Sequence, residues 1–156
     1  MSCYGNSGID QNGIKFLTKI VKLSCYNNEK IKDVNHLTNL KKLYCEQNSG
    51  INQNGIKNLT KIIDFNSNCN KKIIDVNHLH NLKKLSCRNN AGINQCGIRN
   101  LSALTELDCE DNEKITDINH LYTLKMLFCN DKSGIKENGR KNFSGFFFNK
   151  TYKNFY

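Results

Sequence analysis

An internal repeat constrains the fold of this chain more than any other feature of its sequence. Asp33, Asp75 and Asp117 each begin a copy of one segment, which gives a period of 42 residues. The first copy reads DVNHLTNLKKLYCEQNSGINQNGIKNLTKI, and a shorter fourth copy fits the segment from Cys3 to Leu17. A fixed period of this length is typical of solenoids, in which each repeat buries its apolar residues against its neighbours.

Each copy divides into two units that share the pattern L-x-x-L-x-x-L-x-C-x-x-N, beginning at Leu37 in one unit and at Leu59 in the next. Alternating apolar residues such as Leu43 and Cys45 predict a short strand with one buried face, and the i, i+3 spacing before them predicts a helical turn. The pattern predicts strands centred near Ser2, Ser24, Tyr44, Asn66, Ser86, Asp108 and Phe128.

These motifs resemble the leucine-rich-repeat family, whose pattern L-x-x-L-x-L-x-x-N/C-x-L is matched through the Asn. Units that contain N-E-K-I resemble internalin-type repeats, and units that contain N-G-I resemble repeats with a helical turn on the convex side. The resemblance implies an α/β solenoid: an arc with about seven short parallel strands on its concave face and turns, 3-10 or short helices on its convex face. We expect residues 1–139 to form this solenoid.

Residues 140–156 differ from the repeats and are predicted to be a basic, aromatic C-terminal cap or tail. Between Lys132 and Tyr156 there are six basic residues and one acidic residue, and seven of the chain's aromatic residues. Such a segment can cover the exposed end of a solenoid. Interleaved lysines and aromatic residues could instead bind nucleic acid or an anionic membrane surface, and for residues 151–156 both interpretations stay open.

The period also predicts where the apolar pattern ends. It places Phe146 where Leu104 stands one copy earlier, and Asn149 where Leu107 stands, so the pattern is expected to stop at Asn149. We therefore interpret residues 140–148 as an imperfect cap over the last coil.

The strand expected near Ser2 has no capping element before it. An open strand edge can pair with another chain. We expect either self-association through this uncapped N-terminal edge or a chain that is one fragment of a longer repeat array.

Composition and the N-terminal segment favour a cytoplasmic protein without a membrane span. No stretch approaches the run of about 18 apolar residues that a span requires. The first residues have neither the basic start nor the apolar segment of a secretion signal. The eight cysteines are therefore expected to be thiols in a reducing compartment.

Six of the cysteines recur at the inward position two residues after the strand Leu, and we expect them to be core residues. One thiol per coil forms a line with a spacing of about 4.8 Å, whereas a metal site needs ligands that converge on a point. His36, His78 and His120 recur two coils apart, about 10 Å from one another, which is too far to share a metal. We expect no cofactor and no metal. The six cysteines are Cys3, Cys25, Cys45, Cys87, Cys109 and Cys129.

A row of asparagines follows the strands. Asparagine side chains can satisfy backbone groups that a turn leaves unpaired, so we expect these residues to form a structural ladder, with one member in each coil. They are Asn28, Asn48, Asn70, Asn90 and Asn112.

The outward residues of the strands vary from copy to copy, while the inward residues do not. Aromatic residues and Arg are the usual anchors of protein interfaces. No motif places a nucleophile beside a base, so we expect no enzyme but a protein-protein interaction module that binds its partner through the concave strand face. The expected binding residues are Tyr26, Tyr44, Arg88, Glu106, Asp108, Glu110 and Phe128.

The charge of this face separates the two functional hypotheses. Its eighteen outward positions carry four basic and five acidic residues, although the whole chain has a net charge of +9. We therefore expect a protein partner with basic and apolar groups on the concave face. The alternative is nucleic-acid or anionic-surface binding through the basic tail, and any nucleic-acid binding is expected to be weak.

Overall fold

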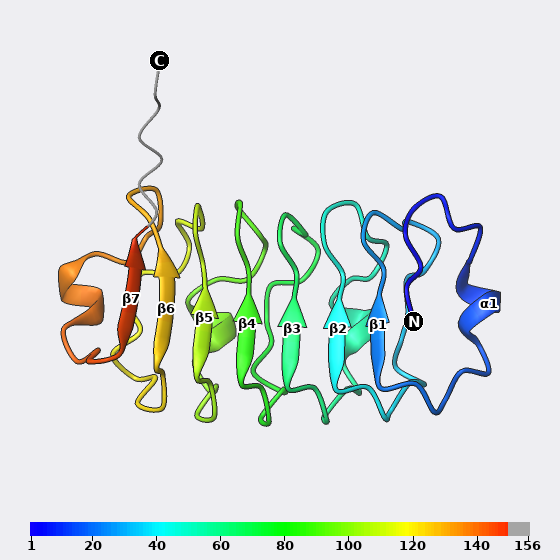
Figure 1. The fold of residues 1–156 in the computed structure, drawn as a ribbon, viewed down its shortest axis with the longest axis horizontal. Helices are drawn as coiled ribbons and strands as arrows, with labels where there is room; N and C mark the ends of the chain where they lie inside the picture. Colours follow the sequence, from blue (N-terminus) through cyan, green and yellow to red (C-terminus); the bar gives the residue numbers. More distant parts are fainter. Residues whose placement is uncertain (150–156) are drawn as a thin grey trace, which may run out of the picture.

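In residues 1–149, seven short parallel strands lie side by side in one sheet and follow one another across it in chain order (Figure 1). The computed structural model describes residues 1–149. Each strand belongs to one coil of a solenoid, and the chain returns behind the sheet to begin the next strand. The strands are β1 (Lys22–Ser24), β2 (Lys42–Tyr44), β3 (Asp64–Asn66), β4 (Lys84–Ser86), β5 (Glu106–Asp108), β6 (Met126–Cys129) and β7 (Phe146–Asn149).

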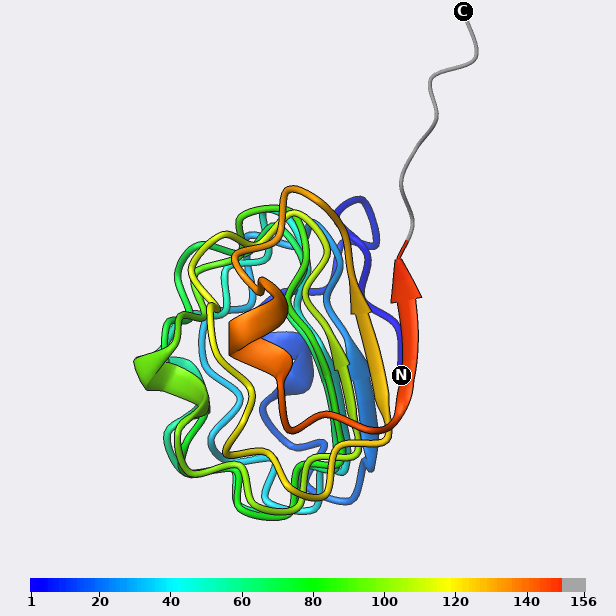
Figure 2. The same cartoon turned by 90° about the vertical axis from the view of Figure 1, so that its left-hand side faces the viewer.

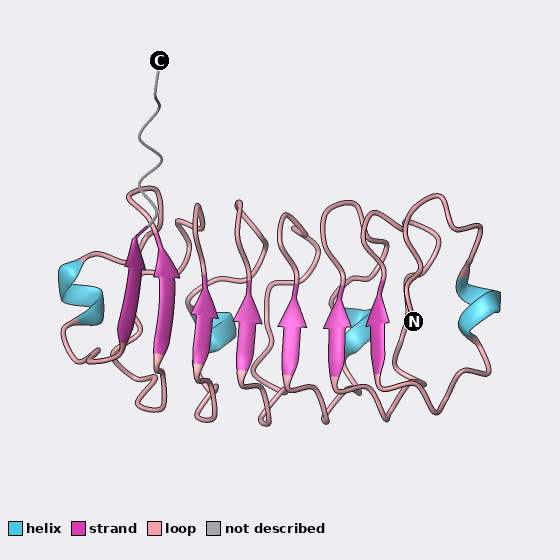
Figure 3. Ribbon diagram, in the orientation of Figure 1, coloured by secondary structure: helices cyan, strands magenta, loops and turns pink. Residues whose placement is uncertain are grey.

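The described part of the chain has four short helices, which lie on the side of the coils away from the sheet (Figures 2 and 3). They occur once per 42-residue copy, in the units with N-G-I or its variants, which confirms the helical turn that the sequence predicted there. Gly55 shows why a glycine recurs in these units: a Cβ at this position would collide with the carbonyl oxygen of Lys32. The helices are α1 (Gln11–Ile14), η1 (Asn54–Ile56), η2 (Cys96–Ile98) and η3 (Glu137–Arg140).

The core is a continuous apolar layer between the sheet and the back of the coils. From β1 to β6 the second residue of each strand points into it, and these residues pair in register from strand to strand, with Phe147 of β7 continuing the row. From β1 to β6 they are at most 1% exposed. The fold is the leucine-rich-repeat solenoid that the sequence predicted. The row in register consists of Leu23, Leu43, Phe65, Leu85, Leu107, Leu127 and Phe147.

The asparagine ladder exists, but only on alternate coils. The Asn70 amide group is buried; it donates to the carbonyl oxygens of Cys45 (2.8 Å) and Ile51 (3.1 Å), and its oxygen accepts from the backbone N–H of Lys72 (2.9 Å). The equivalent residues Asn28 and Asn112 make the same three bonds.

The predicted ladder positions Asn48 and Asn90 are wrong, because both side chains are exposed. In these coils the buried position falls one residue later, at Ser49 and Ala91. The following glycine explains the shift, since a Cβ at Gly50 would lie 2.6 Å from the carbonyl oxygen of Ile31. The backbones of adjacent coils approach so closely here that no buried amide fits between them.

A second set of amides, which the sequence pattern did not reveal, joins three of the four helical turns of residues 1–149 to the next coil. The oxygen of Gln53 accepts from the backbone N–H groups of Ile74 and Asp75 (both 3.0 Å), and its nitrogen donates to the carbonyl oxygen of Asp75 (2.8 Å). Gln11 and Gln95 repeat this arrangement. Backbone groups that the strand ladder leaves unpaired are satisfied in this way, most of them at the exposed back of the coils.

The N-terminal strand expected near Ser2 is reduced to a single parallel bridge between Ser2 and Ser24. The backbone N–H of Cys3 nevertheless donates to the carbonyl oxygen of Ser24 (2.7 Å), so the segment still joins the sheet.

The predicted register of the last residues is wrong: Asn149 does not take the position of the strand leucines but pairs in register with Cys129 of β6. β7 pairs with β6 in parallel, and Phe147, not Asn149, stands in the inward position in register with Leu127. The sheet therefore continues into residues 146–149, beyond the last strand that the sequence predicted.

The reason is that the last coil is two residues shorter than the period requires. Phe143 keeps its repeat position, because its N–H donates to the carbonyl oxygen of Arg140 (3.0 Å) in the manner of the earlier coils. Phe147 therefore follows Phe143 by four residues, whereas Leu107 follows Leu101 by six in the preceding copy. The shorter path passes so close to β6 that a Cβ at Gly145 would collide with the carbonyl oxygen of Lys125.

The ladder on alternate coils leads to a stability prediction with a matched control. Replacing Asn70 by Ala is expected to lower the free energy of unfolding by about 1–3 kcal/mol, because buried backbone groups lose their partners. The exposed Asn48, at the same place in the repeat pattern, is expected to tolerate Ala with a change of less than about 0.5 kcal/mol. Urea unfolding of the two variants decides the matter, and equal losses would contradict the alternation.

Candidate protein-binding face

The outward side of the sheet, here called the strand face, carries all seven residues that the sequence selected. Tyr44, Asp108 and Phe128 lie in one row across the strands, and Glu106 lies in the row before it. Tyr26, Arg88 and Glu110 follow the ends of their strands. The structure does not join these residues into one site: β3 and β4 separate Tyr44 from Asp108, a distance of about 14 Å at the usual strand spacing.

The first of three clusters on the strand face is aromatic and lies at its N-terminal end. The rings of Tyr4 and Tyr26 meet edge to face, with their centroids 6.3 Å apart. The Tyr44 hydroxyl donates to Oδ2 of Asp64 on β3 (2.9 Å), and Nζ of Lys22 lies over the Tyr44 ring, 5.0 Å from its centroid. Burial, followed by the hydrogen bond to Asp64, raises the pKa of Tyr44 to about 12. Tyr44 is therefore a neutral, firmly held ring at ordinary pH.

The second cluster, at the centre of the face, consists of ion pairs. Nε of Arg88 lies 2.6 Å from Oδ2 of Asp108, and its Nη2 lies 3.1 Å from Oε2 of Glu110. Nζ of Lys84 lies 2.6 Å from Oε2 of Glu106. One guanidinium thus bridges two carboxylates on neighbouring rows, and the central cluster keeps a net charge of −1.

Burial differs sharply between these carboxylates. The Glu110 side chain is 4% exposed and that of Glu106 is 26% exposed. Oδ1 of Asp108 and Oε1 of Glu110 are buried and have no hydrogen-bond partner within residues 1–149. The acidic group that the sequence placed here is therefore held inside the protein by Arg88, and only part of it is available to a partner.

The third cluster is apolar and lies at the C-terminal end of the face. The rings of Phe128 and Phe148 are stacked, with centroids 4.6 Å apart and planes at 11°. Met126 pairs in register with Phe146, which is the most exposed phenylalanine of this cluster. This end therefore exposes two large apolar side chains, Phe146 and Phe148.

Sequence reasoning did not select Phe146, Phe148 or Asp64. The run F-F-F-N pairs residue by residue with M-L-F-C of β6. The 42-residue period does not predict this pairing, because it places the run two residues out of register. Asp64 is one of the eighteen outward positions of the sequence pattern, but the pattern does not pair it with Tyr44, because strand register is needed to bring the two together.

The line of thiols is confirmed as part of the core. The six predicted cysteines are buried, none is in a disulfide, and burial raises the pKa of each, to about 12 for Cys25 and Cys87. Ser67 takes the cysteine position in the β3 coil. Cys96 is exposed and Cys69 is half-buried.

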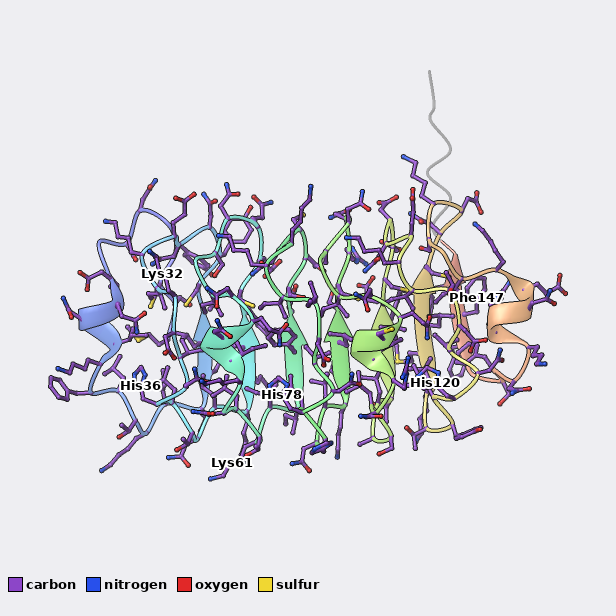
Figure 4. The ribbon with its side chains drawn as sticks, turned by 180° about the vertical axis from the view of Figure 1, so that it is seen from behind. Lys32, His36, Lys61, His78, His120 and Phe147 are labelled. Atoms are coloured by element: carbon purple, nitrogen blue, oxygen red, sulfur yellow. The ribbon has the colours of Figure 1, made fainter. Side chains whose placement is uncertain are left out.

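The three repeated histidines lie in a row behind the sheet (Figure 4). Nε2 of His36 and of His78 lies 3.0 Å from the carbonyl oxygen of Ile14 and of Ile56, respectively, and His120 contacts Ile98 at 3.3 Å. A carbonyl oxygen only accepts, so each Nε2 carries a proton. Each histidine therefore holds the end of a helical turn, which is a structural role.

Within the described part of the chain, no three His, Cys, Asp or Glu residues are arranged to hold a metal ion. No helix among residues 1–149 has the length and apolar character needed to cross a bilayer.

Solved structures similar to this one include internalins and a leucine-rich-repeat protein. Internalin C2 from Listeria monocytogenes matches with a TM-score of 0.63 and 20% identity, over 93% of this chain and 78% of its own. The functional domain of InlJ from the same organism, which includes a cysteine ladder, matches with a TM-score of 0.64 and 27% identity, over 96% of this chain and 39% of its own. A leucine-rich-repeat protein from Leptospira interrogans matches with a TM-score of 0.62 and 23% identity, over 85% and 38%.

This chain therefore spans less than half the length of the InlJ domain and of the Leptospira protein. No protein-family model and no curated protein matches the sequence. The comparisons show the fold.

Thiol labelling tests the buried line. At pH 8 the raised pKa values of Cys25 and Cys87 keep these thiols protonated, and the thiolate is the reactive form. Brief treatment with iodoacetamide, followed by mass spectrometry, is expected to label Cys96 and to leave Cys25 and Cys87 unmodified. The same treatment in urea should label all three, and rapid labelling of Cys87 in the folded protein would contradict its position.

The central ion pairs lead to a prediction about stability. Arg88→Ala leaves two largely buried carboxylates without their cation, so it is expected to cost about 1–3 kcal/mol of unfolding free energy. Lys84→Ala removes a more exposed pair and is expected to cost less than about 1 kcal/mol. Denaturant unfolding of both variants measures the difference, and a smaller loss for Arg88→Ala than for Lys84→Ala would show that the bridge is not stabilising.

Proposed function

We propose that this leucine-rich-repeat solenoid is a non-catalytic module that binds another protein through its strand face. The observation that carries the proposal is the arrangement of two aromatic clusters on one rigid sheet, with a fixed polar centre between them. Buried aromatic anchors dominate the energy of most protein interfaces. The leucine-rich-repeat fold of the similar structures also suits an interaction scaffold.

Preorganisation supports Tyr44 and Phe128 as anchors. Tyr44 is held by Asp64 and Lys22, and Phe128 is stacked on Phe148, so neither ring loses much freedom when a partner covers it. Less lost side-chain entropy means more net binding energy for the same contact. Tyr26, at 37% exposed, offers a further ring at the N-terminal end.

The central cluster favours a partner with basic as well as apolar groups. Glu106, Asp108 and Glu110 outnumber Lys84 and Arg88 by one charge. A polyanion gains nothing from such a surface, because nucleic-acid affinity comes mainly from neutralising phosphates with unpaired Lys and Arg. We therefore propose a protein partner for the strand face. Residues 150–156 of the basic tail, on which the nucleic-acid alternative also depends, lie outside the described residues.

We also propose that the protein works in a reducing, cytoplasmic compartment. All eight cysteines are free thiols in the structure, and six of them are packed in the core as small apolar groups. Such use of cysteine is usual where disulfides do not persist.

Capture of a partner by the immobilised chain tests the proposal. The double variant Tyr44→Ala with Phe128→Ala is expected to lose a partner that the unmodified chain retains, because both anchors are truncated. The matched control is Phe16→Ala with Ile74→Ala, which removes two exposed apolar groups that lie outside the strands. A partner lost with the control and retained by the double variant would place the binding surface elsewhere. The proposal would be overturned if the chain bound DNA or RNA more tightly than any protein and the double variant did not change that affinity.

A further inference from the structure

The outer edge of β7 offers backbone groups that no described residue uses. In a parallel ladder, the N–H and C=O groups of alternate residues point to opposite sides of the strand. The N–H of Phe146 points toward β6, because it donates to the carbonyl oxygen of Lys125 (2.8 Å). The backbone groups of Phe147 therefore point outward, where β7 meets no other strand of residues 1–149.

The core is also incompletely covered at this end. Phe147 is 36% exposed, whereas Leu127, its neighbour in register, is 0% exposed. Figure 4 shows Phe147 at the end of the solenoid beside η3. Its ring is covered only in part, by the guanidinium of Arg140, which lies 4.0 Å from the ring centroid.

Two substitutions in the repeat show that this end is not built to receive another coil of the same kind. Glu137 stands where Gln95 joins its helical turn to the next coil, and a carboxylate cannot donate the hydrogen bond that the amide makes to a carbonyl oxygen. Arg140 stands where Ile98 is buried in the core. The end therefore presents a charged group where the repeat elsewhere has an apolar one.

Charge decides between the possible occupants of the edge. Residues 130–149 carry four basic and two acidic residues, and residues 150–156 add two lysines and no acidic residue. A second copy of this edge, or the chain's own last residues, would bring positive charge to a surface that is already positive. An acidic segment would instead be attracted to it, and its carboxylates could pair with Arg140.

We propose that the outer edge of β7 binds an extended acidic segment of a protein partner, which adds to the sheet as a further parallel or antiparallel strand. Apolar side chains of this segment lie beside Phe146 and Phe148, and an acidic side chain lies beside Phe147 and pairs with Arg140. Backbone hydrogen bonds give affinity in this mode of binding, and alternate side chains give specificity. This surface is separate from the proposed anchors Tyr26 and Tyr44 but borders the third anchor, Phe128, which stacks on Phe148. The two proposals can still fail independently, because the test below changes Arg140 and none of the three anchors.

A labelled seven-residue peptide of alternating Val and Glu tests the charge of the site in the full chain by fluorescence anisotropy. Binding is expected, and a peptide with Lys in place of Glu should bind at least about tenfold more weakly. Arg140→Glu should lower the affinity for the Glu peptide by a similar factor and raise the affinity for the Lys peptide. The matched control is Lys15→Glu, because Lys15 lies over the Phe16 ring (5.4 Å) in a similar cation–ring contact near the opposite end. It should change neither affinity.

Hydrogen exchange tests the strand pairing in the unmodified chain, so it does not depend on the folding of a variant. The Phe147 amide is expected to exchange more slowly when the Glu peptide is bound, and a peptide with Pro at its centre should neither bind nor protect. Equal binding of the Pro peptide, or no effect of Arg140→Glu, would overturn the proposal. Peptide binding that appears only after residues 150–156 are deleted would show that the chain itself occupies the edge, and would also overturn it.

Discussion

Contact between adjacent coils is the constraint on which the rest of this structure depends. A single coil of about twenty residues cannot enclose an apolar core, so each one is stable only while its neighbours cover it. The parallel ladder supplies part of this contact. Side-chain amides supply another part, because Asn70 and Gln53 satisfy backbone groups between the strands and the helical turns. A residue that joins two coils in this way must recur with the period.

The same constraint explains why chemistry can differ along the strand face. Inward positions are fixed by the core, whereas an outward residue affects only its cross-strand neighbours. Over seven strands the face changes from tyrosines to ion pairs to stacked phenylalanines, while the row that includes Leu43 and Leu107 stays apolar. A regular frame can therefore carry an irregular surface, which is what specific recognition of a protein requires.

The last described coil shows what becomes of the repeat where no neighbour from residues 1–149 follows. Arg140 replaces a buried Ile, Glu137 replaces a bridging Gln, and the path to β7 is shortened by two residues. These changes remove the features that would hold another coil of the same type. They leave a strand edge with charged and aromatic side chains in their place, and this combination distinguishes the end from the interior of the solenoid.

Sequence alone determined the solenoid, its inward leucines and cysteines, and the residues of the strand face. The 42-residue period and the alternation of every second residue in a strand can both be read directly from the chain. Tertiary structure decided the rest. β7 escaped prediction because a two-residue shortening changes the register without changing the residue types. Asn48 and Asn70 share a sequence pattern, yet only Asn70 is buried, because the approach of Gly50 to the preceding coil takes up the space. Asp108 and Glu110 proved to be paired with Arg88, because pairing between side chains depends on cross-strand distances that no single repeat encodes.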